Sequence, residues 1–244
     1  MGFVGGVIGT VAAALPEMVR SSRRVDRTTE VSRRTIIILS SVVAAILLLV
    51  GVDRATSRDG DSVATIGDSI TFLDQGEIQK QLSPEFKLNV SATLGITLGQ
   101  SMAAAQALAA TNPHQVIMDL GSNDALSPVP ISQAIADLNA IVATFEETDC
   151  IHLVDLNAHM VAIGRGPVGV EAEQLNDEMH KLAKANSAID IIGWDKIISD
   201  DIAAHPPNGQ LTGDTVHPGP EGQKLLAAEL DTVLHCCGRP WQLW

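Results

Sequence analysis

The sequence is poor in aromatic and basic side chains, and these shortages limit the binding surfaces that it can form. It has no tyrosine and only 3% aromatic residues, so it offers few flat surfaces on which sugar rings could stack. Its 16 Lys and Arg are outnumbered by 29 Asp and Glu, which gives a formal net charge of −13. Because binding to phosphate backbones needs clustered basic residues, we expect no nucleic-acid partner.

Cysteine is also scarce, and neither the cysteines nor the histidines form a metal-ligand pattern. The three cysteines, Cys150, Cys236 and Cys237, contain no CxxC spacing, and the histidines are not spaced as metal ligands. We therefore expect no metal and no cofactor. Outside the cytoplasm, Cys150 could form a disulfide with either member of the adjacent pair, which would leave one thiol spare. Alternatively, the adjacent pair is buried or free.

Charged residues are missing from one long stretch, residues 35–52 (TIIILSSVVAAILLLVGV). This run meets the lower end of the length that spans a bilayer, about 18–20 residues. The arginines that precede it place the N-terminus in the cytoplasm and the rest of the chain outside. A cleaved signal peptide and a buried core helix are the alternatives. No small-x-small cleavage site follows the run, which favours a retained anchor.

These features divide the chain into five parts. We expect a basic cytoplasmic segment (1–34), a single transmembrane signal-anchor helix (35–52), a polar linker (53–61), a folded domain (62–236) and a C-terminal tail (237–244). The acidic excess lies wholly after the apolar run. A basic head and an acidic body separated in this way indicate two compartments, with the folded domain outside the cell membrane.

In the folded part, apolar strand-like runs alternate with amphipathic helical stretches. Strands are predicted at 62–66, 86–90, 114–120, 150–156 and 189–194. Helices are predicted up to about residue 82 and at 99–110, 131–145, 171–185 and 220–234. This alternation is typical of an α/β three-layer sandwich with a five-stranded parallel sheet of the flavodoxin-like kind. Active sites in such folds form at the carboxyl ends of the strands.

Two polar motifs follow predicted strands at this edge. GDSIT (67–71) comes after the first strand, so Ser69 opens a helix with its N–H at the positive helix end. In the simpler interpretation, Asp68 or Ser69 only caps that helix. GSND (121–124) comes after the third strand, and Asn123 could donate a hydrogen bond to an oxyanion near Ser69. The simpler interpretation of GSND is a plain turn.

A third motif, DTVHP (214–218), directly precedes the last predicted helix. Asp214 lies three residues before His217 and can hold one nitrogen of its imidazole, which leaves the other nitrogen free to take a proton from a nucleophile. A lone DxxH often means only a loop histidine and an exposed acid. Together, however, the three motifs supply a nucleophile, an oxyanion donor, an acid and a base at one edge of the sheet.

With GDSIT, GSND and DTVHP in this order, the sequence resembles the SGNH (GDSL-type) hydrolases over residues 62–234. The resemblance implies an α/β hydrolase that acts on ester bonds without a cofactor. It implies Ser69 as the nucleophile, His217 as the base and Asp214 as the acid that holds the base.

The resemblance also implies an oxyanion hole made of three donors. These are the N–H groups of Ser69 and Gly95 and the side-chain amide of Asn123. Gly99 is the alternative to Gly95, because the stretch after the second strand is less distinctive than the other motifs.

The substrate is an ester that the sequence defines only by class. Asp68 and Phe72 flank the nucleophile and are expected at the substrate, and Trp194 could line the same cleft. Core packing is the alternative for both aromatic residues. Anchoring outside the cell indicates an ester of an envelope glycan, of a lipid or of a small molecule. The sequence indicates no particular oligomeric state.

Hydrolysis is the reaction we expect, and three alternatives remain. The sequence is also similar to SGNH domains attached to bacterial membrane O-acyltransferases, through VDLN, IIGWD and DTVHPGPEG. This similarity implies transfer of an acyl group to an envelope glycan as the first alternative. A catalytically silent binding domain on the same fold is the second. A cytoplasmic lipase whose apolar segment packs into its own core is the third.

Overall fold

The computed structural model of the protein describes residues 62–237. The expected cytoplasmic segment, membrane anchor and linker (1–61) lie outside the described residues, as do residues 238–244. Within residues 62–237, no helix has both the length and the apolar character needed to cross a membrane.

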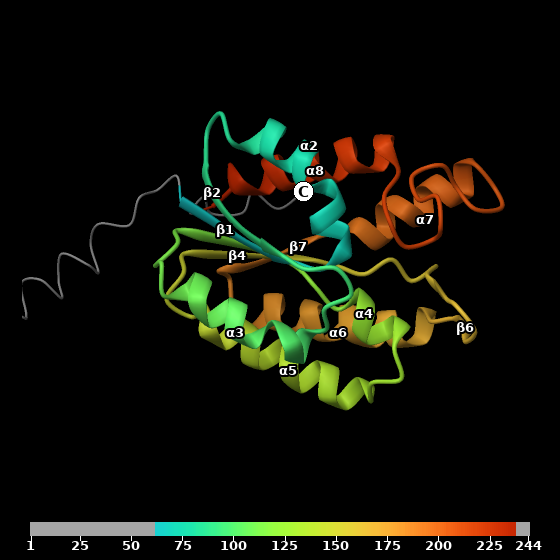
Figure 1. The fold of residues 1–244 in the computed structure, drawn as a ribbon, viewed down its shortest axis with the longest axis horizontal. Helices are drawn as coiled ribbons and strands as arrows, with labels where there is room; N and C mark the ends of the chain where they lie inside the picture. Colours follow the sequence, from blue (N-terminus) through green and yellow to red (C-terminus); the bar gives the residue numbers. More distant parts are fainter. Residues whose placement is uncertain (1–61, 238–244) are drawn as a thin grey trace, which may run out of the picture. The chain divides into compact units, whose positions relative to one another are not determined.

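A parallel sheet of five strands forms the centre of the described domain, as the alternating pattern predicts (Figure 1). Its strand order is β2-β1-β3-β4-β7, and all four pairings between neighbours are parallel. The strands are β1 (Ser62–Gly67), β2 (Lys87–Ala92), β3 (Gln115–Asp119), β4 (Cys150–Val154) and β7 (Ile189–Ile192). Every residue of β3 and β4 is buried. Their mainly apolar sequences fit this burial on both faces, and Gln115, Asp119 and His152 are the polar residues buried with them.

Helices cover both faces of the sheet and complete the three layers (Figure 1). One face carries α2 (Ser69–Leu82), α7 (Trp194–Ala204) and α8 (Pro220–Leu234). The other face carries α3 (Leu98–Ala109), α5 (Ile131–Thr144) and α6 (Gly169–Ala185). The α/β three-layer fold predicted from the sequence is therefore confirmed for the described residues.

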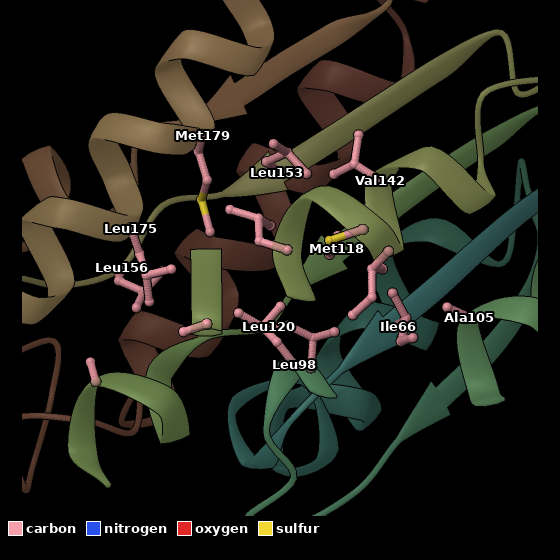
Figure 2. Packing of buried hydrophobic residues seen from close by; sticks show 14 of the residues in the cluster. Ile66, Leu98, Ala105, Met118, Leu120, Val142, Leu153, Leu156, Leu175 and Met179 are labelled. Atoms are coloured by element: carbon pink, nitrogen blue, oxygen red, sulfur yellow. The ribbon is translucent and has the colours of Figure 1, made fainter. Parts of the chain in front are cut away.

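Each face of the sheet contributes to its own apolar cluster. In β3, Val116 and Met118 belong to the cluster beneath α3, α5 and α6, whereas Ile117 between them belongs to the cluster beneath α2, α7 and α8. Side chains of a strand alternate between faces, so one fully buried strand feeds both clusters. Figure 2 shows Met118 of the first cluster near Ile66 of β1 and Leu153 of β4.

Two elements at the carboxyl edge of the sheet differ from the prediction. The strand expected to reach residue 194 ends at Ile192, and Trp194 begins α7 instead. Trp194 and Ile198, one helical turn apart, are both 1% exposed and anchor this helix in the core. A two-stranded antiparallel hairpin, β5 (Val161–Ala162) and β6 (Gly166–Pro167), follows β4 and was not predicted.

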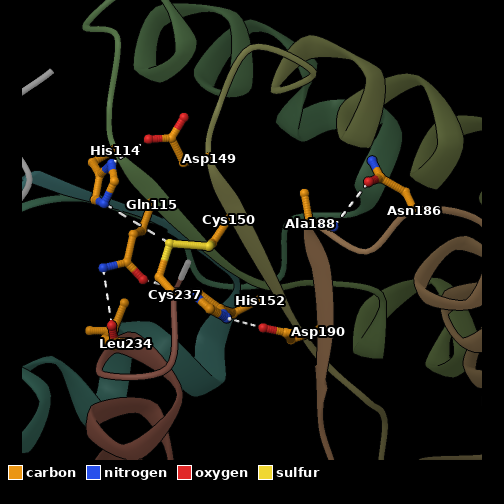
Figure 3. Close-up of a disulfide and its surroundings, with 10 residues drawn as sticks. All are labelled: His114, Gln115, Asp149, Cys150, His152, Asn186, Ala188, Asp190, Leu234 and Cys237. Carbon is orange, nitrogen blue, oxygen red and sulfur yellow. Dashed lines mark hydrogen bonds and ion pairs between the residues drawn. A yellow bond between two sulfur atoms is a disulfide. The ribbon is translucent and has the colours of Figure 1, made fainter. Parts of the chain in front are cut away.

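A disulfide joins Cys150, the first residue of β4, to Cys237 after the end of α8 (Figure 3). Of the two partners that the sequence left open for Cys150, the structure pairs Cys237, and Cys236 is free and exposed. The bond lies at the amino end of the sheet. The sequence places Cys237 in the C-terminal tail (237–244). The disulfide ties this residue covalently to the folded domain.

Candidate active site

Ser69 lies at the first position of α2, where the chain leaves β1 without an intervening loop. The turn is tight, because a Cβ at Gly67 would come within 2.0 Å of Thr71 Oγ1, so only glycine fits there. Asp68 is the N-cap, and its Oδ1 accepts a hydrogen bond from the Ile70 N–H at 2.9 Å. The capping interpretation of GDSIT is thus correct for Asp68, and the cap fixes the position of the serine.

Ser69, His217 and Asp214, far apart in sequence, are brought together at the carboxyl edge of the sheet. His217 Nε2 lies 2.9 Å from Ser69 Oγ, and His217 Nδ1 lies 2.7 Å from Asp214 Oδ2. A serine, an imidazole and a carboxylate in this order allow the ring to take the hydroxyl proton while the carboxylate fixes its orientation. The three residues therefore have the geometry of an activated nucleophile.

The Asp214 carboxylate is held by hydrogen bonds near the protein surface. Its Oδ1 accepts from the N–H groups of Val216 at 3.0 Å and His217 at 2.7 Å, while Oδ2 faces the His217 ring. Partial burial opposes its charged form. The hydrogen bonds from His217 and Val216 outweigh this effect and lower the pKa of Asp214 below its ordinary value. Asp214 therefore remains a carboxylate beside the imidazole.

Asn123 belongs to α4 (Ser122–Leu126), a short helix where a plain turn was the simpler expectation. Gly121 precedes it with a φ of +113°, a conformation that suits glycine. The Asn123 Nδ2 donates to Asp68 Oδ2 at 3.2 Å and to the Ile96 carbonyl at 3.1 Å. These bonds hold the amide next to the residue that precedes the nucleophile. To donate to an oxyanion, the amide would exchange one of them.

The two glycines considered as oxyanion donors differ in their surroundings. Gly95 is exposed in the loop after β2, with a φ of +71°. That loop is held to the end of β1 because the Thr93 N–H donates to the Gly67 carbonyl at 3.2 Å. Gly99 faces α5 instead, and a Cβ there would come within 2.6 Å of Asp137 Oδ2. Gly95 thus lies in a loop attached to the strand that ends before Ser69, and its role as the backbone donor stays a prediction.

The residues expected at the substrate occupy three different environments. Phe72, one helical turn after Ser69, is 43% exposed and can contact a bound ester. Trp194 is buried in the core, so the alternative interpretation of core packing is correct for it. Asp68 is fully buried, with its carboxylate bound to Ile70 and Asn123. Its position is that of a support for the nucleophile rather than of a substrate contact.

A cluster of buried carboxylates beneath the nucleophile was not recognised in the sequence. Asp119 at the end of β3 accepts a hydrogen bond from Thr71 Oγ1 at 2.7 Å, and its carbonyl accepts from the Asp68 N–H at 3.1 Å. Asp74 in α2 is fully buried, and Gln223 faces it, yet neither carboxylate oxygen has a hydrogen bond of normal length. An acidic residue at the end of the apolar run VIMD was the signal that could have revealed Asp119.

Burial raises the pKa of each carboxyl group in this cluster. It brings the pKa of Asp68 and of Asp74 to about 8, and the nearby Asp119 carboxylate adds to both shifts. The pKa of Asp119 itself rises to about 6 for the same reason, with the Thr71 hydrogen bonds acting in the opposite direction. Despite the cluster, no three or more His, Cys, Asp or Glu of residues 62–237 are arranged to hold a metal ion.

Comparison with known families agrees with this geometry. Residues 65–225 match the model of the GDSL-like lipase/acylhydrolase family, as the three motifs predict. No curated protein sequence matches the chain.

Several solved structures share the fold at low sequence identity. A GDSL-like lipase from Bacteroides thetaiotaomicron has a TM-score of 0.63 and 17% identity, over 76% of this chain and 95% of its own. An acetyl xylan esterase has a TM-score of 0.58 and 19% identity, over 70% and 98%. The C-terminal catalytic domain of peptidoglycan O-acetyltransferase A from Streptococcus pneumoniae has a TM-score of 0.56 and 21% identity, over 72% and 93%. At these identities the similarity establishes a common fold.

Proposed function

The chain belongs to the GDSL-like lipase/acylhydrolase family, and from this premise we propose that it is a serine esterase that forms an acyl-enzyme on Ser69. One observation carries the proposal. The His217 ring lies between Ser69 Oγ at 2.9 Å and Asp214 Oδ2 at 2.7 Å, which is the arrangement needed to activate a serine hydroxyl.

In the proposed reaction, Ser69 Oγ attacks the ester carbonyl while His217 Nε2 takes the hydroxyl proton. The resulting oxyanion accepts hydrogen bonds from the N–H groups of Ser69 and Gly95 and from the Asn123 amide. The C–O bond to the alcohol then breaks, and His217 gives its proton to the leaving oxygen. Water attacks the acyl-enzyme with the same base, which releases the acid and restores Ser69. Asp214 keeps the imidazole in one orientation throughout.

We further propose that the enzyme works outside the cytoplasm, held at the cell membrane by residues 35–52. The charge-free run with arginines before it supports this placement. The Cys150–Cys237 disulfide is a second support, because disulfides persist mainly in oxidising compartments. Substrates at that location would be esters of envelope glycans, lipids or exported small molecules. Acetyl esters are the first to test, since an acetyl xylan esterase and a peptidoglycan O-acetyltransferase share the fold.

A second candidate function is transfer of the acyl group to a glycan hydroxyl instead of to water. The exposure of the site favours it as an alternative, because the side chains of His217 and Asp214 are 32% and 58% exposed. A large acceptor alcohol can therefore approach the acyl-enzyme. Hydrolysis and transfer use the same catalytic residues, so only the competition between water and acceptor separates them.

The test uses the full-length chain in detergent, assayed on p-nitrophenyl acetate and on longer-chain p-nitrophenyl esters. We expect hydrolysis that Ser69→Ala lowers at least about 10⁴-fold. Ser83→Ala is the matched control, because Ser83 is exposed at the opposite end of the same helix. It should leave the rate unchanged. A fluorophosphonate probe should label the wild type and Ser83→Ala, but not Ser69→Ala.

Other outcomes identify the alternatives. Probe labelling without ester hydrolysis, together with acetyl transfer to an added glycan, would indicate the acyltransferase. A wild type that neither reacts with the probe nor turns over esters would be a silent domain. Equal activity of the wild type and Ser69→Ala would mean that Ser69 is not the nucleophile.

A further inference from the structure

Thr215, between the acid and the base of the site, has a backbone conformation that is unfavourable for its residue type. Its φ is +68°, in the left-handed region. A β-branched side chain is crowded in this conformation, so Thr215 stays there only if its surroundings hold it. Asn112, at φ +53°, is the other non-glycine residue of the described part with positive φ, and asparagine adopts this region more readily.

Two hydrogen bonds from one neighbouring segment hold Thr215. The Asn157 Nδ2 donates to the Thr215 carbonyl at 2.8 Å, and the Val161 N–H donates to Thr215 Oγ1 at 3.0 Å. Asn157 is only 3% exposed, and its Oδ1 accepts from the His159 N–H at 2.8 Å, which fixes the amide orientation. The backbone and the side chain of Thr215 are therefore both bound from outside the turn.

The segment that holds Thr215 is itself tied to the core. The Ala158 N–H donates to Asp195 Oδ1 at 2.6 Å, and the Asp195 N–H donates to Asp155 Oδ1 at 2.7 Å. Asp155 directly follows β4, and Asp195 lies in the first turn of α7. A continuous set of hydrogen bonds thus runs from the end of a central strand to the turn that carries the acid and the base.

Of residues 214–217, only Val216 is buried, in the apolar cluster beneath α3, α5 and α6. Thr215 and Asn157 both line a cavity of about 160 Å³, and the side chains of Asp214 and His217 are partly exposed. Inside the turn, Asp214 Oδ1 fixes the N–H groups of Val216 and His217. The hydrogen bonds from the segment that contains Asn157 therefore act together with the packing of Val216 to fix the turn relative to Ser69.

We propose that Thr215 and Asn157 are positioning residues that keep the Asp214–His217 pair in reach of Ser69. Without them, the turn relaxes from the left-handed conformation and His217 spends less time with its Nε2 at the serine hydroxyl. Neither residue touches the reacting atoms. The inference rests on the proposed esterase activity, because it predicts the effect of these residues on the acylation of Ser69.

The test compares Thr215→Gly, Thr215→Ser and Asn157→Ala in the full-length protein. Thr215→Gly removes the hydroxyl that accepts from Val161 and leaves the backbone free to adopt other conformations, so we expect its kcat to fall about tenfold or more. Because the crowding is also relieved, its melting temperature should not fall. Asn157→Ala should lower kcat similarly, with KM changed less than about twofold. Thr215→Ser keeps the hydroxyl that accepts from Val161 and should retain most of kcat. Rates of fluorophosphonate labelling should follow the same order.

Two control variants lie away from the site. Asn112→Gly places glycine at the other residue with a left-handed backbone conformation, before β3, and is the control for Thr215→Gly. Asn186→Ala removes an asparagine side chain that accepts from the Ala188 N–H at 3.0 Å, and is the control for Asn157→Ala. Both should keep the kcat of the wild type. If Thr215→Gly and Asn157→Ala also keep it, the inference is wrong although the esterase proposal stands. A wild type that does not react with the probe would overturn the esterase proposal and this inference with it.

Discussion

The carboxylates at the active site fall into two regions, Asp214 at the surface and the group of Asp68, Asp74 and Asp119 beneath the nucleophile. Hydrogen bonds lower the pKa of Asp214, whereas burial and mutual repulsion raise the pKa of Asp68 and Asp74 to about 8. The charge that the reaction uses therefore lies where solvent and hydrogen bonds stabilise it. The buried charges instead lower stability whenever they form.

Removing the charge at the surface should have the largest effect on activity and a small effect on stability. We expect Asp214→Asn to lower kcat by about 10³–10⁴-fold, because an amide does not hold the imidazole in the orientation that accepts the serine proton. Its melting temperature should stay close to that of the wild type. Steady-state kinetics and thermal unfolding measure the two effects, with the exposed Asp200→Asn as the matched control. A loss below tenfold would show that His217 is oriented without Asp214.

Asn123 connects the two regions, since its amide contacts Asp68 and is the expected oxyanion donor. Asn123→Ala should lower kcat by about 10²–10³-fold with little change in KM, the cost of losing one donor to the developing oxyanion. Asn139→Ala in α5 removes a partly buried asparagine distant from the motifs and serves as its control. An unchanged kcat in Asn123→Ala would assign the oxyanion to the backbone donors alone.

Removing a charge from the buried region should have the smallest of these effects. We expect it to change the free energy of unfolding. Because the pKa of Asp74 is raised from 3.8 to about 8 on folding, the unfolded chain releases this proton at lower pH than the folded chain does. The free energy of unfolding should therefore fall as pH rises from about 4 to 8. Asp74→Asn removes this contribution and should stabilise the protein by about 1–2 kcal/mol at pH 9 and by little at pH 5.

Urea denaturation of the wild type and Asp74→Asn between pH 5 and pH 9 measures this difference. The two curves of unfolding free energy against pH should diverge as pH rises. Curves that stay parallel would mean that Asp74 ionises in the folded protein as readily as in the unfolded chain. The pKa of Asp74 would then not be raised by burial, and Asp74 would not differ from Asp214 in the way described above.

The residues that the structure brings together as the sequence predicts are those encoded locally. Ser69 directly follows an apolar strand, and Asp214 and His217 lie within one turn, so short motifs are enough to identify them. The sheet is predictable for a similar reason, because strands buried on both faces have mainly apolar sequences. The geometry that brings Ser69 and His217 together follows from the motifs once the strand ends share one edge.

The parts that escape prediction depend on contacts between segments far apart in sequence. The hydrogen bond between Asn157 and Thr215 spans 58 residues. Both residues lie within motifs named above, VDLN and DTVHP, but neither motif indicates that the two residues meet. The burial of Asp74 becomes evident only when α2 is packed against α8. Trp194 was predicted to be the last residue of a strand. It is instead the first residue of α7, and its side chain packs in the core. Side-chain packing decides each of these outcomes.

The disulfide between Cys150 and Cys237 closes a loop of the chain that contains the exposed β5–β6 hairpin as well as Asp214 and His217. Ser69 lies outside this loop. A protease that cuts the hairpin at the exposed Ile163 would place the nucleophile and its base on different polypeptides. The two polypeptides would still be a single covalent molecule, joined at the end of the sheet opposite to the active site. The enzyme is thus built so that one cut at this hairpin does not release either half of its catalytic residues.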